Sequence, residues 1–212
     1  MKRITLLLTL AAGLLLGAHP AAALEWGKDY VELGQTQKTD VKPGQVEVLE
    51  FFWYRCPHCF ELEPELNAWA KKLPKDVVLK KVPGILNPGW AALARAYYAL
   101  EAVGKLDKLH SEVFNAIHVQ GMDLNPPERF FDWAVTKGVD RKQIADAYNS
   151  FAVNTKVMRA QQLTGAYKLN GVPAFAVNGK YVTSAYMTGS TSSAFKALDE
   201  LIDQERKNKG KK

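Results

Sequence analysis

The chain has 212 residues, of which 47% are hydrophobic and 24% are charged, and its formal net charge is +6. These values are ordinary for a globular protein of one ample domain, or of one domain with a sizeable insertion, and they exclude a disordered or fibrous chain. Basic residues gather in the stretch 206–212, but no aromatic residues interleave with them. We therefore expect a solvated C-terminal end there and no nucleic-acid partner.

The first 23 residues have the three parts of a secretory signal peptide. Lys2 and Arg3 come first, an apolar run follows over residues 4–18, and three alanines at 21–23 suit signal-peptide cleavage. The apolar run is short for a bilayer span, so an uncleaved membrane anchor is the weaker alternative. We expect cleavage after residue 23 and export to an oxidising compartment, where a protein can use a disulfide as a reagent.

A strand–helix–strand unit is predicted in the N-terminal part of the mature chain. After a short first strand at 26–33, residues 46–54 are β-branched and aromatic, as is typical of a strand buried on both faces. A helix is predicted over 57–73, with apolar residues recurring on one face and Pro64 inside it. Because a strand follows at 77–82, we expect a parallel, right-handed crossover.

The pattern then becomes helical before the sheet resumes. Four helical patterns precede the return to strands, at 90–103, 105–119, 126–134 and 151–169, with Asp140 placed to cap one more and Asn170-Gly171 to stop the last. Strands at 174–177 and 181–183 flank Asn178-Gly179, a dipeptide that favours a type I′ hairpin turn. A final helix is expected over 191–206, with Ser190 as its cap.

The chain contains two cysteines, Cys56 and Cys59, and both lie between the predicted buried strand and the first helix. If Cys56 caps that helix and Pro57 is its first residue, Cys59 lies one turn later on the same side, within reach of a disulfide. Such a bond closes a very small loop and adds little as a structural staple, so a reversible redox role is favoured.

A zinc site is the alternative use of the two cysteines, but tetrahedral zinc needs two further ligands. The mature chain offers His58, His110 and His118. His58 lies within the cysteine motif, and we interpret His110 and His118 as helix-surface or satisfied packing residues. We therefore expect no metal.

The two cysteines are expected to play different parts. Cys56, at a helix N-terminus, faces unpaired backbone N–H groups and the positive end of the helix dipole, which favour its thiolate. His58 can add a hydrogen bond or a positive charge to that thiolate. Cys56 is thus the predicted nucleophile, and Cys59, shielded by the helix, forms or resolves the mixed disulfide.

Two further features are candidates for the same site. Glu50 lies in the apolar strand and is a candidate proton donor or acceptor for Cys59, with Lys80 or Lys81 as its counter-ion; the alternative is a strand-end glutamate in contact with water. Val172-Pro173 stands where the helical segment returns to a strand. The peptide bond before Pro173 is a candidate for the cis form, and the alternative is an ordinary trans proline in a loop.

Taken together, the chain resembles the thioredoxin fold and, more closely, the DsbA family of periplasmic thiol oxidases. The likeness rests on the segment 48–52 followed by Cys56-Pro57-His58-Cys59, on a helical insertion, and on Gly171-Val172-Pro173 before a hairpin and a last helix. It covers the chain from about Trp26 onward. It implies an α/β fold with a mixed central sheet flanked by helices, formed by residues 24–84 and 165–212, with an inserted helical domain at 85–164.

The resemblance also implies roles for individual residues. Cys56 would be the exposed nucleophile and Cys59 its buried partner, Pro173 the cis-proline with substrate beside Val172, and Glu50 the acid beneath the site. Lys81 matches the family's buried lysine, although Lys80 beside it leaves the register open. Arg55, directly before Cys56, departs from the pattern and places a cation next to the nucleophile.

The function implied is that of an exported oxidase without a cofactor, monomeric, which donates its Cys56–Cys59 disulfide to reduced, unfolded or partly folded exported proteins. A DsbB-like membrane quinone reductase would reoxidise it. A disulfide isomerase or reductase of the same fold ranks lower, because only about twenty residues separate Leu24, the expected start of the mature chain, from the strand at Val46 and leave little room for a dimerisation segment. A peptide-binding holdase with incidental cysteines is the alternative from another class.

Overall fold

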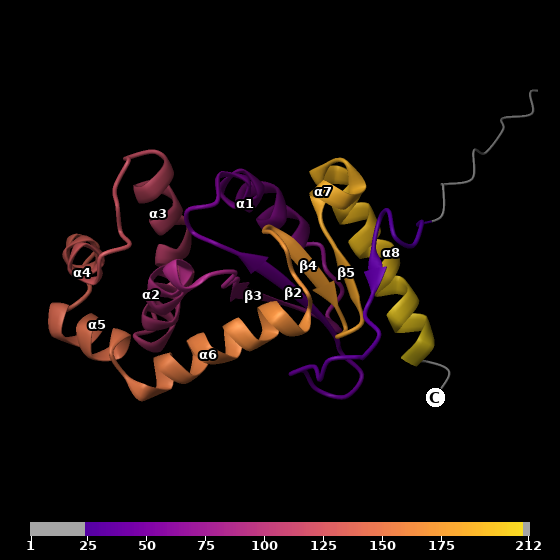
Figure 1. Ribbon diagram of the computed structural model, residues 1–212, viewed down its shortest axis with the longest axis horizontal. Coiled ribbons are helices and arrows are strands. Elements are labelled where there is room, and N and C mark those ends of the chain that lie inside the picture. Colours follow the sequence, from indigo (N-terminus) through magenta and orange to yellow (C-terminus); the bar gives the residue numbers. More distant parts are fainter. Residues whose placement is uncertain (1–23, 210–212) are drawn as a thin grey trace, which may run out of the picture.

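The structure is a computed structural model that describes residues 24–209, so the expected signal peptide at 1–23 lies outside the described residues. Within this range a five-stranded sheet has the order β1-β5-β4-β2-β3. Its strands are β1 Val31–Glu32, β2 Val46–Phe52, β3 Val77–Pro83, β4 Ala174–Val177 and β5 Tyr181–Thr183. Helices cover both faces of this mixed sheet (Figure 1), as expected for a thioredoxin-like fold.

The strand β2 is the centre of the sheet, and all seven of its residues are buried. It pairs in parallel with β3 and antiparallel with β4. Its apolar residues fit that position because a strand covered on both faces has no solvated side. The helix α1 (Pro57–Ala70) connects β2 to β3 and completes the predicted parallel crossover. The strand was expected to reach Tyr54 but ends at Phe52, where the chain turns and the Cys56 N–H donates to the Trp53 carbonyl.

A run of helices separates β3 from β4. They are η1 Pro88–Trp90, α2 Ala91–Ala102, α3 Leu106–His118, α4 Pro127–Thr136, α5 Arg141–Tyr148 and α6 Phe151–Ala166. Asp140 caps α5 as predicted, with its carboxylate accepting from the Gln143 N–H, and Ser150 caps α6 in the same way. In Figure 1 α2 to α5 gather beside the sheet, and α6 runs back toward it.

Several boundaries differ from the sequence prediction. The first strand is only Val31–Glu32, because a turn follows Trp26 and leaves an isolated bridge to Tyr30. The helix α6 ends at Ala166 and not at Leu169, since Lys168 takes the left-handed conformation two residues later.

The C-terminal part contains one element that the sequence prediction lacked. The short helix α7 (Ala185–Thr188) was not predicted, whereas α8 (Thr191–Lys209) was, with Ser190 accepting from the Ser193 N–H as its cap. The hairpin turn between β4 and β5 is the type I′ turn expected, because Asn178 and Gly179 both have positive φ, at 51° and 73°.

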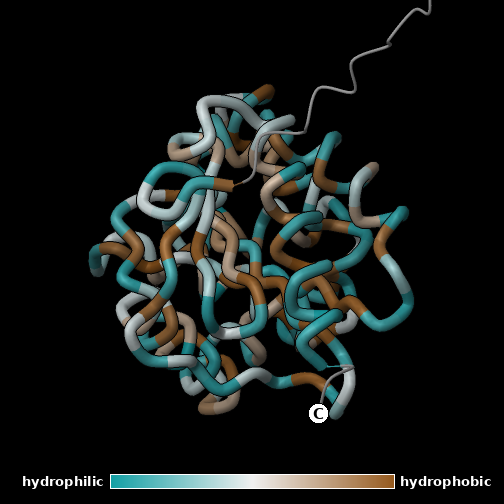
Figure 2. The backbone as a smooth tube through the Cα atoms, turned by 90° about the vertical axis from the view of Figure 1, so that its right-hand side faces the viewer, coloured by the Kyte–Doolittle hydropathy of each residue, from teal (hydrophilic) through white to brown (hydrophobic). Residues whose placement is uncertain are grey.

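The core has two parts, one on each side of the sheet. The larger joins β2 and β3 to the helical insertion, and the smaller lies between β2, β4, α1 and α8. Figure 2 shows hydrophobic stretches of backbone crossing the interior, with hydrophilic stretches on several outer turns. Among residues 24–209 there is no helix of the length and apolar character needed to cross a membrane.

Candidate active site

Cys56 is the N-cap of α1, as the sequence predicted, and Pro57 is at the start of the helix. Its sulfur accepts a hydrogen bond from the Cys59 backbone N–H at 3.3 Å. This is the geometry in which an N-cap side chain satisfies one of the free N–H groups of the first turn. Cys56 is 8% exposed and Cys59 is 0% exposed, so Cys56 is the more accessible of the two, although it is less open than the expected exposed nucleophile.

The two thiols, which are not bonded to each other, titrate in opposite directions. The pKa of Cys56 is lowered to about 6, chiefly by a hydrogen bond from the Cys59 side chain; burial opposes this, and the backbone N–H groups of Cys59 and His58 contribute. Burial raises the pKa of Cys59 far above its ordinary value. Near neutral pH the pair therefore holds a thiolate at Cys56 and a proton at Cys59.

The His58 imidazole contacts Glu61 and makes no hydrogen bond to the reactive sulfur within the described residues. Its Nδ1 lies 3.2 Å from a Glu61 carboxylate oxygen, and the side chain is 79% exposed. The charge of His58 is the smallest of the influences that lower the Cys56 pKa. Arg55 likewise lies 3.6 Å from Asp123, as an exposed ion pair.

The Val172–Pro173 peptide bond is cis. The Val172 carbonyl lies 3.4 Å from the Cys56 sulfur and accepts a hydrogen bond from it when Cys56 is protonated. On the other side of this loop Gly84 is packed closely, because a Cβ added there would lie 2.9 Å from a Val172 methyl carbon. The loop that begins β4 is thus held between the end of β3 and the redox pair.

Glu50 is fully buried, which rules out the strand-end position in contact with water. Lys81, its register partner on β3, places its Nζ 3.3 Å from a Glu50 oxygen in an ion pair. Lys80 lies on the other face and pairs with Asp40 and Glu47. Burial raises the pKa of Glu50 to about 7 even with Lys81 beside it.

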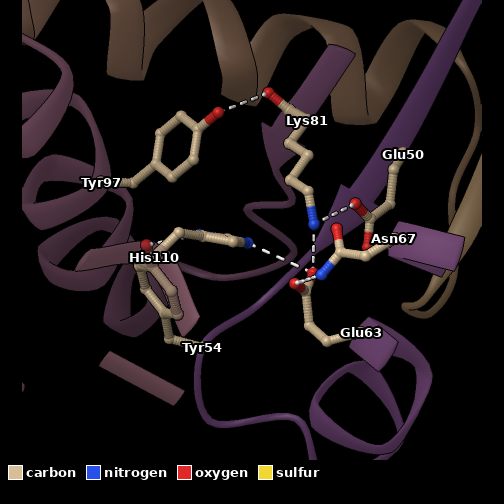
Figure 3. A network of polar contacts seen from close by, with 7 residues as sticks. All are labelled: Glu50, Tyr54, Glu63, Asn67, Lys81, Tyr97 and His110. Carbon is tan, nitrogen blue, oxygen red and sulfur yellow. Dashed lines mark hydrogen bonds and ion pairs between the residues drawn. The ribbon is translucent and has the colours of Figure 1, made fainter. Parts of the chain in front are cut away.

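Three residues that the sequence prediction did not assign to the site complete this buried network (Figure 3). Glu63 on α1 contacts Lys81, and the Nε2 of His110 lies 3.2 Å from the same Glu63 oxygen. The Nδ1 of His110 lies 2.8 Å from the Tyr54 hydroxyl. The interpretation of His110 as a helix-surface residue is wrong, because it is 7% exposed; the satisfied packing alternative describes its contacts.

One signal in the sequence pointed to Glu63. It follows Cys59 by four residues, so it interrupts the apolar face of the predicted helix with a carboxylate.

His118 is also a satisfied packing residue, since its Nε2 lies 2.8 Å from the Tyr54 carbonyl and its ring stacks on Phe60.

Comparison with known proteins places this geometry in a family. The chain matches the DSBA-like thioredoxin domain over residues 74–199. It is 43% identical to the thiol:disulfide interchange protein DsbA of Bordetella pertussis over 189 residues, covering 89% of this chain and 90% of that protein. The chain belongs to the DsbA family. It is 37% identical to the DsbA of Pseudomonas aeruginosa strain PAO1, across 97% of this chain and 98% of the relative.

Solved structures of the DsbA family agree with this assignment. The crystal structure of Pseudomonas aeruginosa DsbA superimposes with a TM-score of 0.83 at 38% identity, over 88% of this chain and 96% of that one. The reduced DsbA1 of Neisseria meningitidis gives a TM-score of 0.77 at 30% identity, over 91% and 100%. The protein is therefore a thiol:disulfide oxidoreductase with a thioredoxin fold, and its redox group is its own cysteine pair, without a separate cofactor.

Proposed function

We propose that the protein is an exported oxidase that donates a Cys56–Cys59 disulfide to cysteine pairs of newly translocated proteins. The observation that carries this proposal is the opposite titration of the two thiols, with the Cys56 pKa lowered to about 6 and the Cys59 pKa raised. A stable Cys56 thiolate favours the reduced enzyme over the disulfide form. Each unit by which this pKa lies below ambient pH corresponds to about 1.4 kcal/mol, or about 30 mV of oxidising strength for a two-electron couple.

The reaction begins when a substrate thiolate attacks the Cys56 sulfur of the disulfide. The S–S bond breaks, its electron pair leaves on the Cys59 sulfur, and Cys59 takes up a proton. A second substrate thiolate then attacks the substrate sulfur of the mixed disulfide and releases Cys56 as a thiolate. The substrate loses two electrons and two protons; the enzyme gains both electrons and keeps one proton on Cys59, and the other proton goes to solvent.

The residues around the pair divide the remaining tasks. His58 and the first turn of α1 favour the Cys56 thiolate. Glu50, paired with Lys81, donates a proton to Cys59 or accepts one from it. Substrate lies extended beside Val172 and Pro173 and pairs its backbone with this loop as an added strand. We assign the thioredoxin-like domain to 24–84 and 165–212 and the inserted helical domain to 85–164.

The cellular setting follows from the N-terminal pattern and from the family. Lys2, Arg3 and the apolar run to residue 18 support export to the periplasm. The substrates are reduced, unfolded or partly folded exported proteins, and the enzyme acts as a monomer. A DsbB-like membrane quinone reductase takes the two electrons from the reduced pair and restores the disulfide.

The test is the oxidation of a reduced two-cysteine peptide by the purified, oxidised protein, together with its equilibrium against glutathione. We expect stoichiometric peptide oxidation and an equilibrium strongly on the side of reduced enzyme. The Cys56→Ala variant removes the disulfide and should lose oxidation entirely, whereas in a holdase peptide binding would be the main activity and would survive. A strongly reducing equilibrium with an ordinary Cys56 pKa would overturn the oxidase in favour of a reductase.

Single-cysteine variants assign the two sulfurs. Both Cys56→Ala and Cys59→Ala are offered a peptide whose cysteine is activated as a mixed disulfide. We expect Cys59→Ala to form a covalent peptide adduct rapidly near neutral pH, because it keeps the accessible sulfur, and Cys56→Ala to react slowly. Faster reaction of Cys56→Ala would reverse the assigned roles.

A further inference from the structure

The buried network beneath the cysteines contains two carboxylates that share one ammonium group. Glu50 is 0% exposed and Glu63 is 5% exposed. Lys81 forms ion pairs with both of them. Since one positive charge cannot fully neutralise two buried carboxylates, one of the two must be poorly compensated.

The contacts show which carboxylate is better served. Glu63 receives Lys81, the His110 Nε2 at 3.2 Å, and the Asn67 side-chain amide, which donates at 3.2 Å. Glu50 has only the 3.3 Å ion pair with Lys81, and within the described part of the chain neither of its oxygens has a hydrogen-bond partner of good geometry. Glu63 is therefore the ionised carboxylate, and Glu50 is the one that keeps a proton.

His110 fixes this arrangement from the helical insertion. The Tyr54 hydroxyl, 2.8 Å from Nδ1, has a proton to give, so it makes Nδ1 the acceptor. The other ring nitrogen then carries the hydrogen and donates it to Glu63. A residue of α3 thereby holds a carboxylate of α1, the helix that carries both cysteines (Figure 3).

We propose that Glu63 and His110 are positioning residues for the proton that Glu50 exchanges with Cys59. Glu63, held by His110, binds the Lys81 ammonium and leaves Glu50 without a full counter-ion. Glu50 is therefore the carboxyl group that holds a proton at the pH values below its ionisation, and it can deliver that proton. This inference rests on the proposed oxidase function, because it assigns a purpose to a proton at Cys59.

The proton step balances with the disulfide exchange. When the Cys56–Cys59 bond breaks, the electron pair on the Cys59 sulfur takes the proton from the Glu50 carboxyl group, which becomes a carboxylate. Glu50 then regains a proton from water on the side of Lys81, whose side chain is 19% exposed. In reoxidation the same steps run backward, and the Glu50 carboxylate accepts the proton of Cys59.

The surroundings of Glu50 support this proton balance. The polar groups whose charges couple to Glu50 come from β3, α1, α2 and the segment before α1; they are Lys81, Glu63, Cys59, Tyr97 and Tyr54. On the opposite strand its register partner is the apolar Phe175. Burial raises the pKa of Glu50 to about 7, Lys81 lowers it and Glu63 raises it, whereas Glu63 itself, raised by burial, is brought down to about 2 by His110 and Lys81.

The Glu63→Gln variant tests the inference directly, with the Glu50 carboxyl titration followed by carbon NMR in the full-length reduced protein. Removing the Glu63 charge frees Lys81 for Glu50, so the Glu50 pKa should fall by about one unit or more. The Lys81→Met variant removes the shared cation and should move the Glu50 pKa in the opposite direction, upward. An unchanged Glu50 pKa in both variants would overturn the inference.

Glu65→Gln is the matched control, because Glu65 is an exposed glutamate on the same helix and the substitution removes the same charge. We expect no shift of the Glu50 pKa in this variant. Stopped-flow kinetics measures how fast the Cys56–Cys59 disulfide opens, and that rate should fall as Glu50 loses its proton. In Glu63→Gln the pH midpoint of this fall should shift by as much as the Glu50 pKa measured by NMR, whereas in Glu65→Gln it should stay unchanged. A kinetic pH profile that does not follow the NMR shift would remove the proton-transfer part of the inference.

Two substitutions separate the hydrogen bonds of His110 from its volume. His110→Phe fills the space without a donor, so the Glu63 pKa should rise by about one unit. His110→Gln keeps a donor and should restore most of the low Glu63 pKa; equal values in both variants would exclude the positioning role. These titrations do not depend on oxidase activity, so a failed peptide-oxidation test would refute the proposed function while leaving the charge network measurable.

Discussion

At the scale of single residues, one helical turn separates two sulfurs of opposite acidity. Cys56 lies at the helix start, where its sulfur accepts the Cys59 N–H and a hydrogen bond from the Cys59 side chain, and its pKa falls to about 6. Cys59 lies in the first turn of α1 without exposure, and burial raises its pKa. The difference arises from the hydrogen bond that the Cys59 thiol donates to Cys56, from desolvation and from the free N–H groups of the first turn, since the two side chains are chemically identical.

Glu50 allows a prediction on stability at the same scale. Burial raises its folded pKa to about 7, so below the ordinary carboxyl pKa the protonated group costs nothing, and stability is lost as pH rises through about 7. In Glu50→Gln this loss should be absent. The stability advantage of the variant over the parent, measured as free energy of unfolding, should therefore be about 3 kcal/mol larger at pH 8 than at pH 4. Urea unfolding at both pH values measures the difference.

The Glu63→Gln variant should change the free energy of unfolding in the opposite direction. The folded pKa of Glu63 lies at about 2, below its ordinary value, so its carboxylate stabilises the fold above that ordinary value and the contribution disappears in acid. We expect Glu63→Gln to weaken the protein at pH 8. If Glu50→Gln weakened it as well, the balance of charges assigned to the network would be incorrect.

Sequence reasoning reached the residues whose roles are local. The helix cap at Cys56 and the position of Pro57 follow from neighbours in the chain, so both could be predicted. The sequence left both Lys80 and Lys81 as candidate counter-ions of Glu50, because the strand register decides between them and the sequence does not show that register. His110 contacts Glu63 and Tyr54 across 47 and 56 residues, and no pattern near residue 110 encodes those contacts.

At the scale of elements, the site is a junction of β2, the start of α1 and the loop that enters β4. The end of β3 supports this junction, since the Gly84 N–H donates to the Phe52 carbonyl and a Cβ at residue 84 would meet Val172 at 2.9 Å. Glycine is required at that position because the β-branched Val172 side chain has little freedom to move aside. The loop position thus depends on the absence of a side chain at Gly84.

Gly84→Ala is therefore expected to displace the Val172 loop and to slow substrate oxidation, with a loss of about 1–3 kcal/mol in free energy of unfolding from overpacking. The double variant Gly84→Ala/Val172→Ala makes room for the added methyl group and should recover most of the stability. Urea unfolding of the two single variants and the double variant gives the coupling between the sites. Additive losses would show that the two residues do not contact each other.

The predicted elements were most accurate where periodicity and caps agree. The buried strand β2, the capped helices α5 and α8 and the Asn178-Gly179 turn all follow from local signals. The end of α6 did not, because Lys168 rather than the expected Asn170-Gly171 adopts the left-handed conformation. The short helix α7 has four residues, too few for a periodic pattern to show.

At the scale of the whole molecule, the helical insertion does more than cover the sheet. The larger core cluster contains residues of β2 and residues of α2 to α6, so sheet and insertion share one buried interior. Through His110 the insertion also contacts the helix that carries the cysteines. Changes in redox state at Cys56 and Cys59 should therefore be felt in the stability of the molecule as a whole.

The pH dependence of the two redox states tests this expectation. The reduced protein has a Cys56 pKa of about 6, below the ordinary thiol value, whereas the disulfide form has no thiol to titrate there. A depressed folded pKa stabilises the reduced form fully above the ordinary thiol pKa, and this stabilisation is lost as pH falls through about 6. At pH 7 it amounts to at most about 1.4 kcal/mol, less what solvent screening removes.

We therefore expect the melting temperature of the reduced form, relative to the oxidised form, to rise by a few degrees between pH 5 and pH 8, with the reduced form the more stable one near neutral pH. Calorimetry of both forms at matched pH measures this difference. The Cys56→Ser variant is the control, because it lacks the titrating thiol and its melting temperature should follow the pH profile of the oxidised form. A difference between the two redox forms that does not change with pH would show that the Cys56 thiolate does not set their relative stability, and the direction of electron flow would then have to come from the strain or solvation of the disulfide.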